Sequence, residues 1–311
     1  MNLRALTTPL RPLGLWAPIG LPDPQALIDV RFRAGRTECD VTGNQVVLSL
    51  APLHVGIGDV ATRQLRGEVA ELQFCDRVSG VELGVLRLEE HGAINAAGVR
   101  VTRFRVTRAA HRCLPAPLRT WQSWMQRRRA DTSSPFHMSP AALEQLAVFY
   151  ICPRPVVLVS AQDGECSNLF PMDLIGPVAG PRFVLALRNT SPSVAILQNS
   201  RRAALADVAL GERSLAYALG KHHRESNIDW SALPCQAARS SHFGLRVPAH
   251  ALRVREFEIL AAEPHGSHTV FVCRLVSDEG GADAPRLFHT SGIHGAWRRR
   301  HGAVPWHEPS P

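Results

Sequence analysis

The sequence predicts a mainly β protein with a few helices, divided into two β-rich parts of which the N-terminal part is the smaller. Short apolar runs near period two recur along the chain and are separated by glycine, proline, asparagine and aspartate, as strands and turns are. Helical spacing occurs only in brief segments. The 311 residues, 45% hydrophobic and 20% charged, are enough for two domains with substantial cores.

The N-terminal part predicts a small β domain. Residues 1–24 are rich in proline, so we expect an extended arm there. In the last strand the apolar residues change phase between Val101 and Phe104, which indicates a bulge or a twisted barrel strand. The domain resembles no known family, and we expect a β-barrel or sandwich that packs against its neighbour or a partner. Its predicted strands are Val46–Leu50, Val69–Phe74, Val81–Leu88 and Val99–Val106.

A helix is predicted over Pro117–Arg129, because Leu118, Trp121 and Met125 fall on one face. This face could dock on a core or a dimer partner, or could contact a membrane surface or nucleic acid. We favour docking, because a single closing turn of arginines is little for a basic surface and suits the negative end of the helix dipole. The polar segment that follows predicts a linker, so we divide the chain into residues 1–130 and 131–311.

The charge and the cysteines exclude several classes of function. The formal net charge is +8 and the isoelectric point is near 9.7, but the arginines are spread along the chain and Lys221 is the only lysine. Without a basic groove interleaved with aromatic residues, we expect no nucleic-acid binding. Seven widely spaced cysteines without a Cys-x-x-Cys pair indicate reduced thiols, with no disulfide framework and no metal site.

The N-terminal segment and the hydropathy pattern predict a cytoplasmic protein. Pro9, Pro12 and Pro18 interrupt the apolar residues that a signal peptide would need. No apolar run approaches 18 residues, so we expect no membrane span.

The stretch from residue 150 to residue 208 organises the C-terminal part. The apolar runs Val156–Val159 and Phe183–Leu187 predict two strands, the first of which ends at an Asp-Gly turn. After the second strand, Ser191 is a good N-cap and Pro192 fits the first helical position. A strand is therefore expected to lead directly into a helix N-terminus.

This strand-to-helix junction has the chemistry of an anion site. The free N–H groups and the dipole of a helix N-terminus favour a negative charge. Arg188 can add a positive charge, and Thr190, Ser191 and Ser193 can add hydroxyl donors. The alternative is a well-capped helix beside a surface arginine.

Residues 140–300 resemble the flavin reductase-like family, whose members have an FMN-binding split barrel. The opening strand of the family, Pro-x-Pro-Val-x-Leu-Val-Ser, is similar to residues 153–160, PRPVVLVS. Gly164, Ser167 and Asn168 stand where the family has a glycine turn, a small polar residue and asparagine. The family's phosphate-binding turn, Arg-x-x-Ser/Thr-x-Ser/Thr, is similar to residues 188–193.

The resemblance implies a C-terminal FMN-binding split β-barrel and a set of cofactor contacts. The cofactor would be FMN, with NAD(P)H as a possible co-substrate, and no side chain is assigned a catalytic role. It also implies a homodimer with flavin near the subunit interface, and a possible flavin-dependent partner enzyme. The implied or candidate contacts are Ser167, Asn168, Met172, Asp173, Leu174, Arg188, Asn189, Thr190, Ser191, Ser193, Lys221 and His222.

The remaining C-terminal elements follow from turn and strand patterns. A short helix is expected before Gly220, followed by a polar loop over 221–224 that could lie over a flavin. The adjacent histidines of this loop diverge and lack a third ligand, so they predict no metal site. His289 and Arg298 are the last residues suited to site chemistry. The other predicted elements are helices over 140–149 and 214–219 and strands over 252–260, 269–276 and 286–290.

Three functions stay open at this point. The first is an NAD(P)H-dependent flavin oxidoreductase, in which hydride passes from the nicotinamide to the flavin. The second is a non-catalytic or electron-transfer FMN-binding protein of the same fold, favoured by Ile196 and Asp207 where the family often has asparagine. The third is a scaffold with an unoccupied barrel and the N-terminal domain as its working part.

Overall fold

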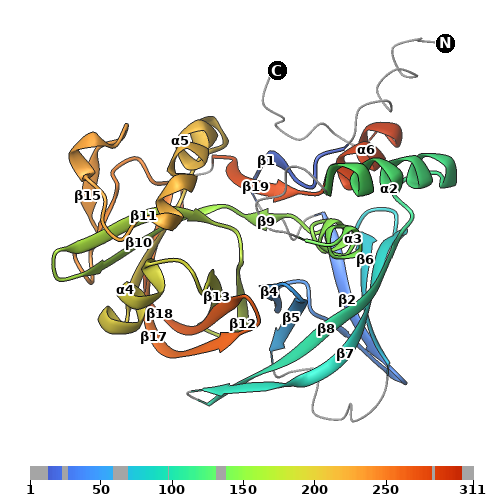
Figure 1. The fold of residues 1–311 in the computed structure, drawn as a ribbon, viewed down its shortest axis with the longest axis horizontal. Helices are drawn as coiled ribbons and strands as arrows, with labels where there is room; N and C mark the ends of the chain where they lie inside the picture. Colours follow the sequence, from blue (N-terminus) through green and yellow to red (C-terminus); the bar gives the residue numbers. More distant parts are fainter. Residues whose placement is uncertain are drawn as a thin grey trace.

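Two seven-stranded antiparallel sheets form most of the protein, as the computed structural model shows (Figure 1). The structure describes residues 13–22, 27–58, 69–96, 98–130, 138–281 and 284–302. The mainly β class is confirmed. No helix in these ranges is long and apolar enough to cross a membrane.

The first sheet is built from the N-terminal part of the chain and has the strand order β3-β2-β6-β7-β8-β5-β4. Its two longest strands, β7 and β8, form a hairpin with two register shifts. One of these shifts lies opposite the segment Thr102–Phe104, so the bulge predicted from the phase change is confirmed. The strands are β2 (Ile28–Ala34), β3 (Thr37–Asp40), β4 (Gln45–Leu50), β5 (Leu53–Gly58), β6 (Ala70–Asp76), β7 (Glu82–Ala96) and β8 (Val99–His111).

The second sheet belongs to the C-terminal part and has the order β11-β10-β14-β17-β18-β13-β12. All seven strands place apolar side chains in one buried cluster, among them Val159, Phe170 and Phe271. The sheet therefore curls round its own core, as in a β-barrel. Its strands are β10 (Val157–Asp163), β11 (Cys166–Met172), β12 (Ile175–Ala179), β13 (Arg182–Arg188), β14 (Arg202–Asp207), β17 (Arg253–His265) and β18 (His268–Gly280).

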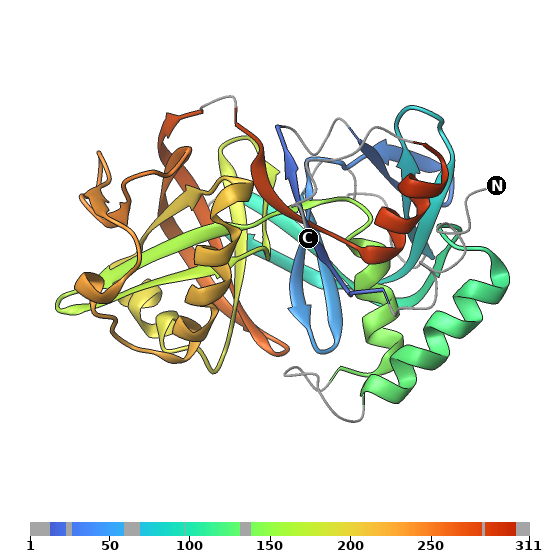
Figure 2. The same cartoon turned by 90° about the horizontal axis from the view of Figure 1, so that it is seen from above.

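A third, three-stranded sheet connects the two ends of the chain. Its order is β1-β19-β9, so a strand near the N-terminus pairs with one near the C-terminus (Figures 1 and 2). A two-stranded sheet of β15 and β16 stands beside the second barrel. These strands are β1 (Ala17–Leu21), β9 (Arg154–Pro155), β15 (Ala237–Arg239), β16 (Arg246–Pro248) and β19 (Arg286–Thr290).

Short helices fill the spaces between and beside the sheets. Their bounds are α2 (Ala116–Ala130), α3 (Pro140–Phe149), α4 (Ser193–Ser200), α5 (Arg213–Ala218) and α6 (Gly292–Arg300), with 3-10 helices η3 (Leu210–Glu212), η4 (Leu219–Arg224) and η5 (Trp230–Ala232). Helix α3 has the predicted bounds, because Ser139 caps its N-terminus and Pro140 starts it.

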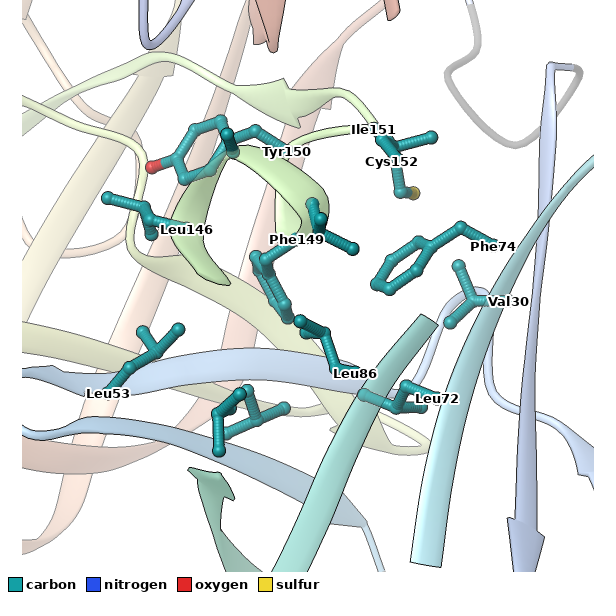
Figure 3. Packing of buried hydrophobic residues seen from close by; sticks show 14 of the residues in the cluster. Val30, Leu53, Leu72, Phe74, Leu86, Leu146, Phe149, Tyr150, Ile151 and Cys152 are labelled. Atoms are coloured by element: carbon teal, nitrogen blue, oxygen red, sulfur yellow. The ribbon is translucent and has the colours of Figure 1, made fainter. Parts of the chain in front are cut away.

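The core of the first sheet also includes residues from beyond the predicted linker. Phe149 of α3 packs edge-on against Phe74 of β6, with ring centroids 6.2 Å apart (Figure 3). Ile293 and Trp297 of α6 belong to the same buried cluster. The division at residue 130 stays a prediction, but the hydrophobic core extends across it.

Several elements differ from the sequence prediction. Strand β7 continues to Ala96, beyond the predicted end at Leu88, because pairing with β8 supplies the hydrogen bonds that local propensity does not. Strand β5 was not predicted, since Gly56 and Gly58 weaken its strand signal. The expected loop over 221–224 is the 3-10 helix η4.

Candidate functional site

The junction between β13 and α4 is a tight turn that leaves a buried hydroxyl without a partner. The N–H of Ser191 donates to the carbonyl of Arg188 at 2.9 Å, and that of Val194 donates to the carbonyl of Ser191 at 3.0 Å. Helix α4 begins at Ser193 with Pro192 at the N-cap and no side-chain cap. The prediction that Ser191 caps the helix is therefore wrong. Ser191 is only 5% exposed, and its Oγ makes no hydrogen bond.

Positive charge gathers at this junction. The pKa of Arg188 is lowered by burial and by the charge of Arg224. His268 lies directly opposite Arg188 in the pairing of β13 with β18. Burial, together with the Arg188 charge, lowers the pKa of His268 to about 4, so this ring is neutral near pH 7. We call Arg188, Ser191, Arg224 and His268 the basic corner.

Asn168 holds the elements around the basic corner together. Its side chain is fully buried, and its amide nitrogen lies 2.9 Å from Ser193 Oγ. The same nitrogen lies 2.9 Å from the carbonyl oxygen of His222 and 2.8 Å from that of Glu225. These contacts fix the start of α4 and the end of η4 against β11. Asn168 therefore positions the corner, and its amide nitrogen is fully engaged by protein.

Most of the neighbouring predicted residues also make protein contacts. Trp230 Nε1 donates to Ser167 Oγ at 2.9 Å. The amide of Asn189 donates to the carbonyl of Gly266 at 3.0 Å, and its oxygen accepts from Thr269 at 3.0 Å. Thr190 and Lys221 are exposed. The His222 ring is buried, with Nδ1 2.8 Å from the Leu169 carbonyl.

Met172, Asp173 and Leu174 form a separate group at the other end of β11. Met172 and Leu174 pack in the core of the second barrel. Asp173 Oδ2 lies 2.7 Å from His289 Nδ1, and His289 Nε2 lies 3.2 Å from the hydroxyl of Tyr217. Burial raises the pKa of Asp173, but hydrogen bonds from His289 and Tyr150 outweigh this and leave the pKa below its ordinary value.

The two groups can do different chemistry. The basic corner offers a guanidinium, an unpartnered hydroxyl and a helix N-terminus, which suit a phosphate group. The Asp173–His289–Tyr217 chain links a carboxylate to a half-exposed phenol through both ring nitrogens of one histidine, and can hold or move a proton. Among the described residues, no group of three histidine, cysteine or acidic side chains is arranged to bind a metal.

A cavity of about 200 Å³ lies between the two seven-stranded sheets, and it is lined by other residues than those predicted to bind FMN. Gln45, Arg154 and Gly176 are among its lining residues, and none of the predicted FMN contacts lines it. The basic corner is separate from this cavity: its Ser191 and His268 are buried, whereas its Arg224 is exposed.

Sequence reasoning missed four residues of these two groups. His268 can be found only from the pairing of β13 with β18, because 79 residues separate Arg188 from its partner along the chain (268 − 188 − 1). Arg224 was noted only as part of a polar loop. Tyr150 and Tyr217 carry no local motif, and reach Asp173 and His289 through the tertiary fold.

Comparison with known proteins finds likeness only at the level of structure. No family model matches the chain, and no curated protein matches it in sequence. It is similar over 41% of its length to 72% of an FMN-binding protein from Thermus thermophilus with bound p-hydroxybenzaldehyde, at 22% identity and a TM-score of 0.37.

Two flavin reductases are also similar in structure. The NADH:FAD oxidoreductase of Streptomyces globisporus matches 49% of this chain over 89% of its own, at 16% identity and a TM-score of 0.43. The flavin reductase component of a bacterial two-component tryptophan halogenase matches 47% of this chain over 91% of its own, at 18% identity and a TM-score of 0.42. These are the classes that the sequence resemblance named, but scores below 0.5 carry no functional argument.

Proposed function

We propose that the protein is an FMN-binding oxidoreductase and that the basic corner binds the phosphate of FMN. The observation that carries this proposal is the unpartnered Ser191 hydroxyl, buried at the start of α4 beside Arg188. A buried hydroxyl without a partner costs free energy, which a phosphate oxygen would remove. The same anion would offset the unfavourable proximity of Arg188 and Arg224.

Bound FMN would supply the redox chemistry, accepting hydride from NAD(P)H. The chain would supply position: Arg188 and Ser191 hold the phosphate, and Asn168 fixes the two helical segments that border it. His289, hydrogen-bonded on both ring nitrogens, can hold a proton between Asp173 and Tyr217. In this proposal a flavin-dependent partner enzyme would use the reduced flavin.

The proposal is tested by titrating the purified protein with FMN and then measuring NADH and NADPH oxidation with added FMN. Saturable FMN binding with steady nicotinamide oxidation supports the oxidoreductase. FMN binding without oxidation would leave an FMN-binding or electron-transfer protein. Failure to bind FMN at all would refute the proposal and favour a scaffold with an unoccupied barrel.

A further inference from the structure

The two seven-stranded sheets have the same strand order. In the first sheet the order is β3-β2-β6-β7-β8-β5-β4, and in the second it is β11-β10-β14-β17-β18-β13-β12. Strands in the same position of the two orders also follow each other in the same sequence along the chain. The five strands from β2 to β6 correspond to the five from β10 to β14, and the hairpin β7–β8 corresponds to β17–β18. Both sheets are antiparallel throughout.

The irregularities of the two sheets also correspond. Hairpins β2–β3 and β10–β11 each have a two-residue turn. In each turn the first residue is a glycine with positive φ: Gly35 at 53° and Gly164 at 57°. The register of β4–β5 shifts between Val47 and Ser49, and that of β12–β13 shifts between Pro177 and Ala179. Bulges are specific features of a fold, so their agreement argues against two unrelated sheets.

The long hairpins give the most detailed agreement. Strands β8 and β18 begin at Val99 and His268, each three positions after the last residue of the preceding strand. In β8 one register shift lies between Val106 and Arg108, which are seven and nine residues after Val99 (106 − 99 and 108 − 99). In β18 it lies between Leu275 and Ser277, seven and nine residues after His268 (275 − 268 and 277 − 268).

We propose that the N-terminal sheet is a second copy of the same barrel, and that it occupies the place of a second subunit against the C-terminal barrel. A twofold interface brings corresponding elements of two copies into contact with each other. Here β4 contacts its counterpart β12, and the reciprocal pairs β4 with β13 and β5 with β12 are also in contact. The chain would thus contain, within one polypeptide, the interface that a homodimer would form from two.

Corresponding residues meet at this interface. By strand register Val46 corresponds to Gly176, and a Cβ built on Gly176 would lie 3.3 Å from the Cβ of Val46. Leu48 and its counterpart Val178 lie in one buried apolar cluster with Val101 and its counterpart Val270. The contact between the barrels is therefore apolar and symmetric in its central residues, as in a permanent dimer interface.

The backbones approach so closely that one position requires glycine. A Cβ on Gly58 of β5 would lie 1.5 Å from the carbonyl oxygen of Val178 in β12. The φ of Gly58 is not in the left-handed region, so its backbone conformation does not require glycine. The Cβ would also lie 2.2 Å from Oδ1 of Asn44, which is the end of a side chain, whereas the nearer Val178 oxygen belongs to the backbone of the other sheet.

The correspondence also implies one FMN site per chain, an inference that rests on the proposed function. His268 of the basic corner corresponds to Val99, since each is the first residue of its strand. The N-terminal copy therefore lacks the histidine at that position. The β4–β5 turn of this copy borders the corner instead, because Ser49 Oγ and the N–H of Ala51 each lie 3.2 Å from Ser267 Oγ.

The molar mass in solution tests the proposal without any flavin. Light scattering on the full chain is expected to give a monomer of 34.1 kDa at all accessible concentrations. A dimer of twice this mass would overturn the proposal. Failure of the chain to bind FMN would leave this measurement unaffected, so the two proposals fail separately.

A disulfide cross-link tests whether the contact between β4 and β12 forms within one chain or between two chains. Val46→Cys with Gly176→Cys places two Cβ atoms near the separation of a disulfide, with each single variant as control. Under oxidation the double variant is expected to give a cross-link within one chain, found by peptide mass spectrometry. A covalent dimer specific to the double variant would show that another chain supplies the contact, and would overturn the proposal.

Discussion

Replacing Arg188 by alanine tests the assignment of the basic corner most sharply. Arg188 ends β13 beside Arg224 and opposite His268, where a phosphate would accept charge-assisted hydrogen bonds. Losing such bonds costs about 1.5 to 3 kcal/mol, so Arg188→Ala should weaken FMN binding by about 10- to 150-fold. The assay is a titration of FMN fluorescence, with the exposed turn residue in Arg36→Ala as a matched control.

A companion variant separates binding from stability. The Oγ of Ser191 makes no protein hydrogen bond, so Ser191→Ala removes none and should leave the thermal stability of the flavin-free protein unchanged or slightly raised. It should weaken FMN binding by about 1.5 kcal/mol, or roughly tenfold, if the hydroxyl donates to phosphate. Wild-type FMN affinity in both Arg188→Ala and Ser191→Ala would show that the basic corner does not bind the phosphate.

Three further predictions concern stability and are read by denaturant or thermal unfolding. The folded-state pKa of His268 is lowered from 6.5 to about 4, so the unfolded state binds more protons between these values. This pKa difference contributes about 3 kcal/mol to the free energy of unfolding above pH 6.5, and that contribution should be lost as the pH falls to 4. His268→Gln should therefore make the free energy of unfolding depend less on pH in this range. Asn168→Ala should lower the free energy of unfolding by about 1 to 3 kcal/mol, because the buried carbonyl oxygens of His222 and Glu225 lose their donor. An unchanged unfolding midpoint would contradict the positioning role of Asn168. Asp207→Asn should destabilise by about 3 to 5 kcal/mol, because Arg255 at 2.7 Å and Arg286 at 3.1 Å lose their counter-charge; a smaller loss would mean that solvent replaces it.

Local signals predicted many single elements of the fold. Helix α3 and strand β19 have the predicted bounds, because a capped proline start and a short apolar run are properties of neighbouring residues. The end of β13 beside a helix N-terminus was also predicted. The error at Ser191 is local as well: helix α4 has its N-cap at Pro192, one residue later than the N-cap preference of Ser191 suggests.

Long-range features could not be predicted from the sequence. The position of His268 opposite Arg188 depends on pairing between strands that are distant in the chain. The correspondence between the two sheets lies in strand order and bulge positions, while the residues themselves differ, as Val99 differs from His268. The glycine at position 58 weakens a strand signal locally but is required by close packing between the barrels.

The visible absorption spectrum of the protein, as purified and after incubation with FMN and desalting, shows directly whether the chain binds FMN. We expect bound flavin at one equivalent per chain in the wild type, and loss of this flavin on desalting in Arg188→Ala. Colourless protein that retains no FMN after reconstitution would refute the proposed FMN-binding function.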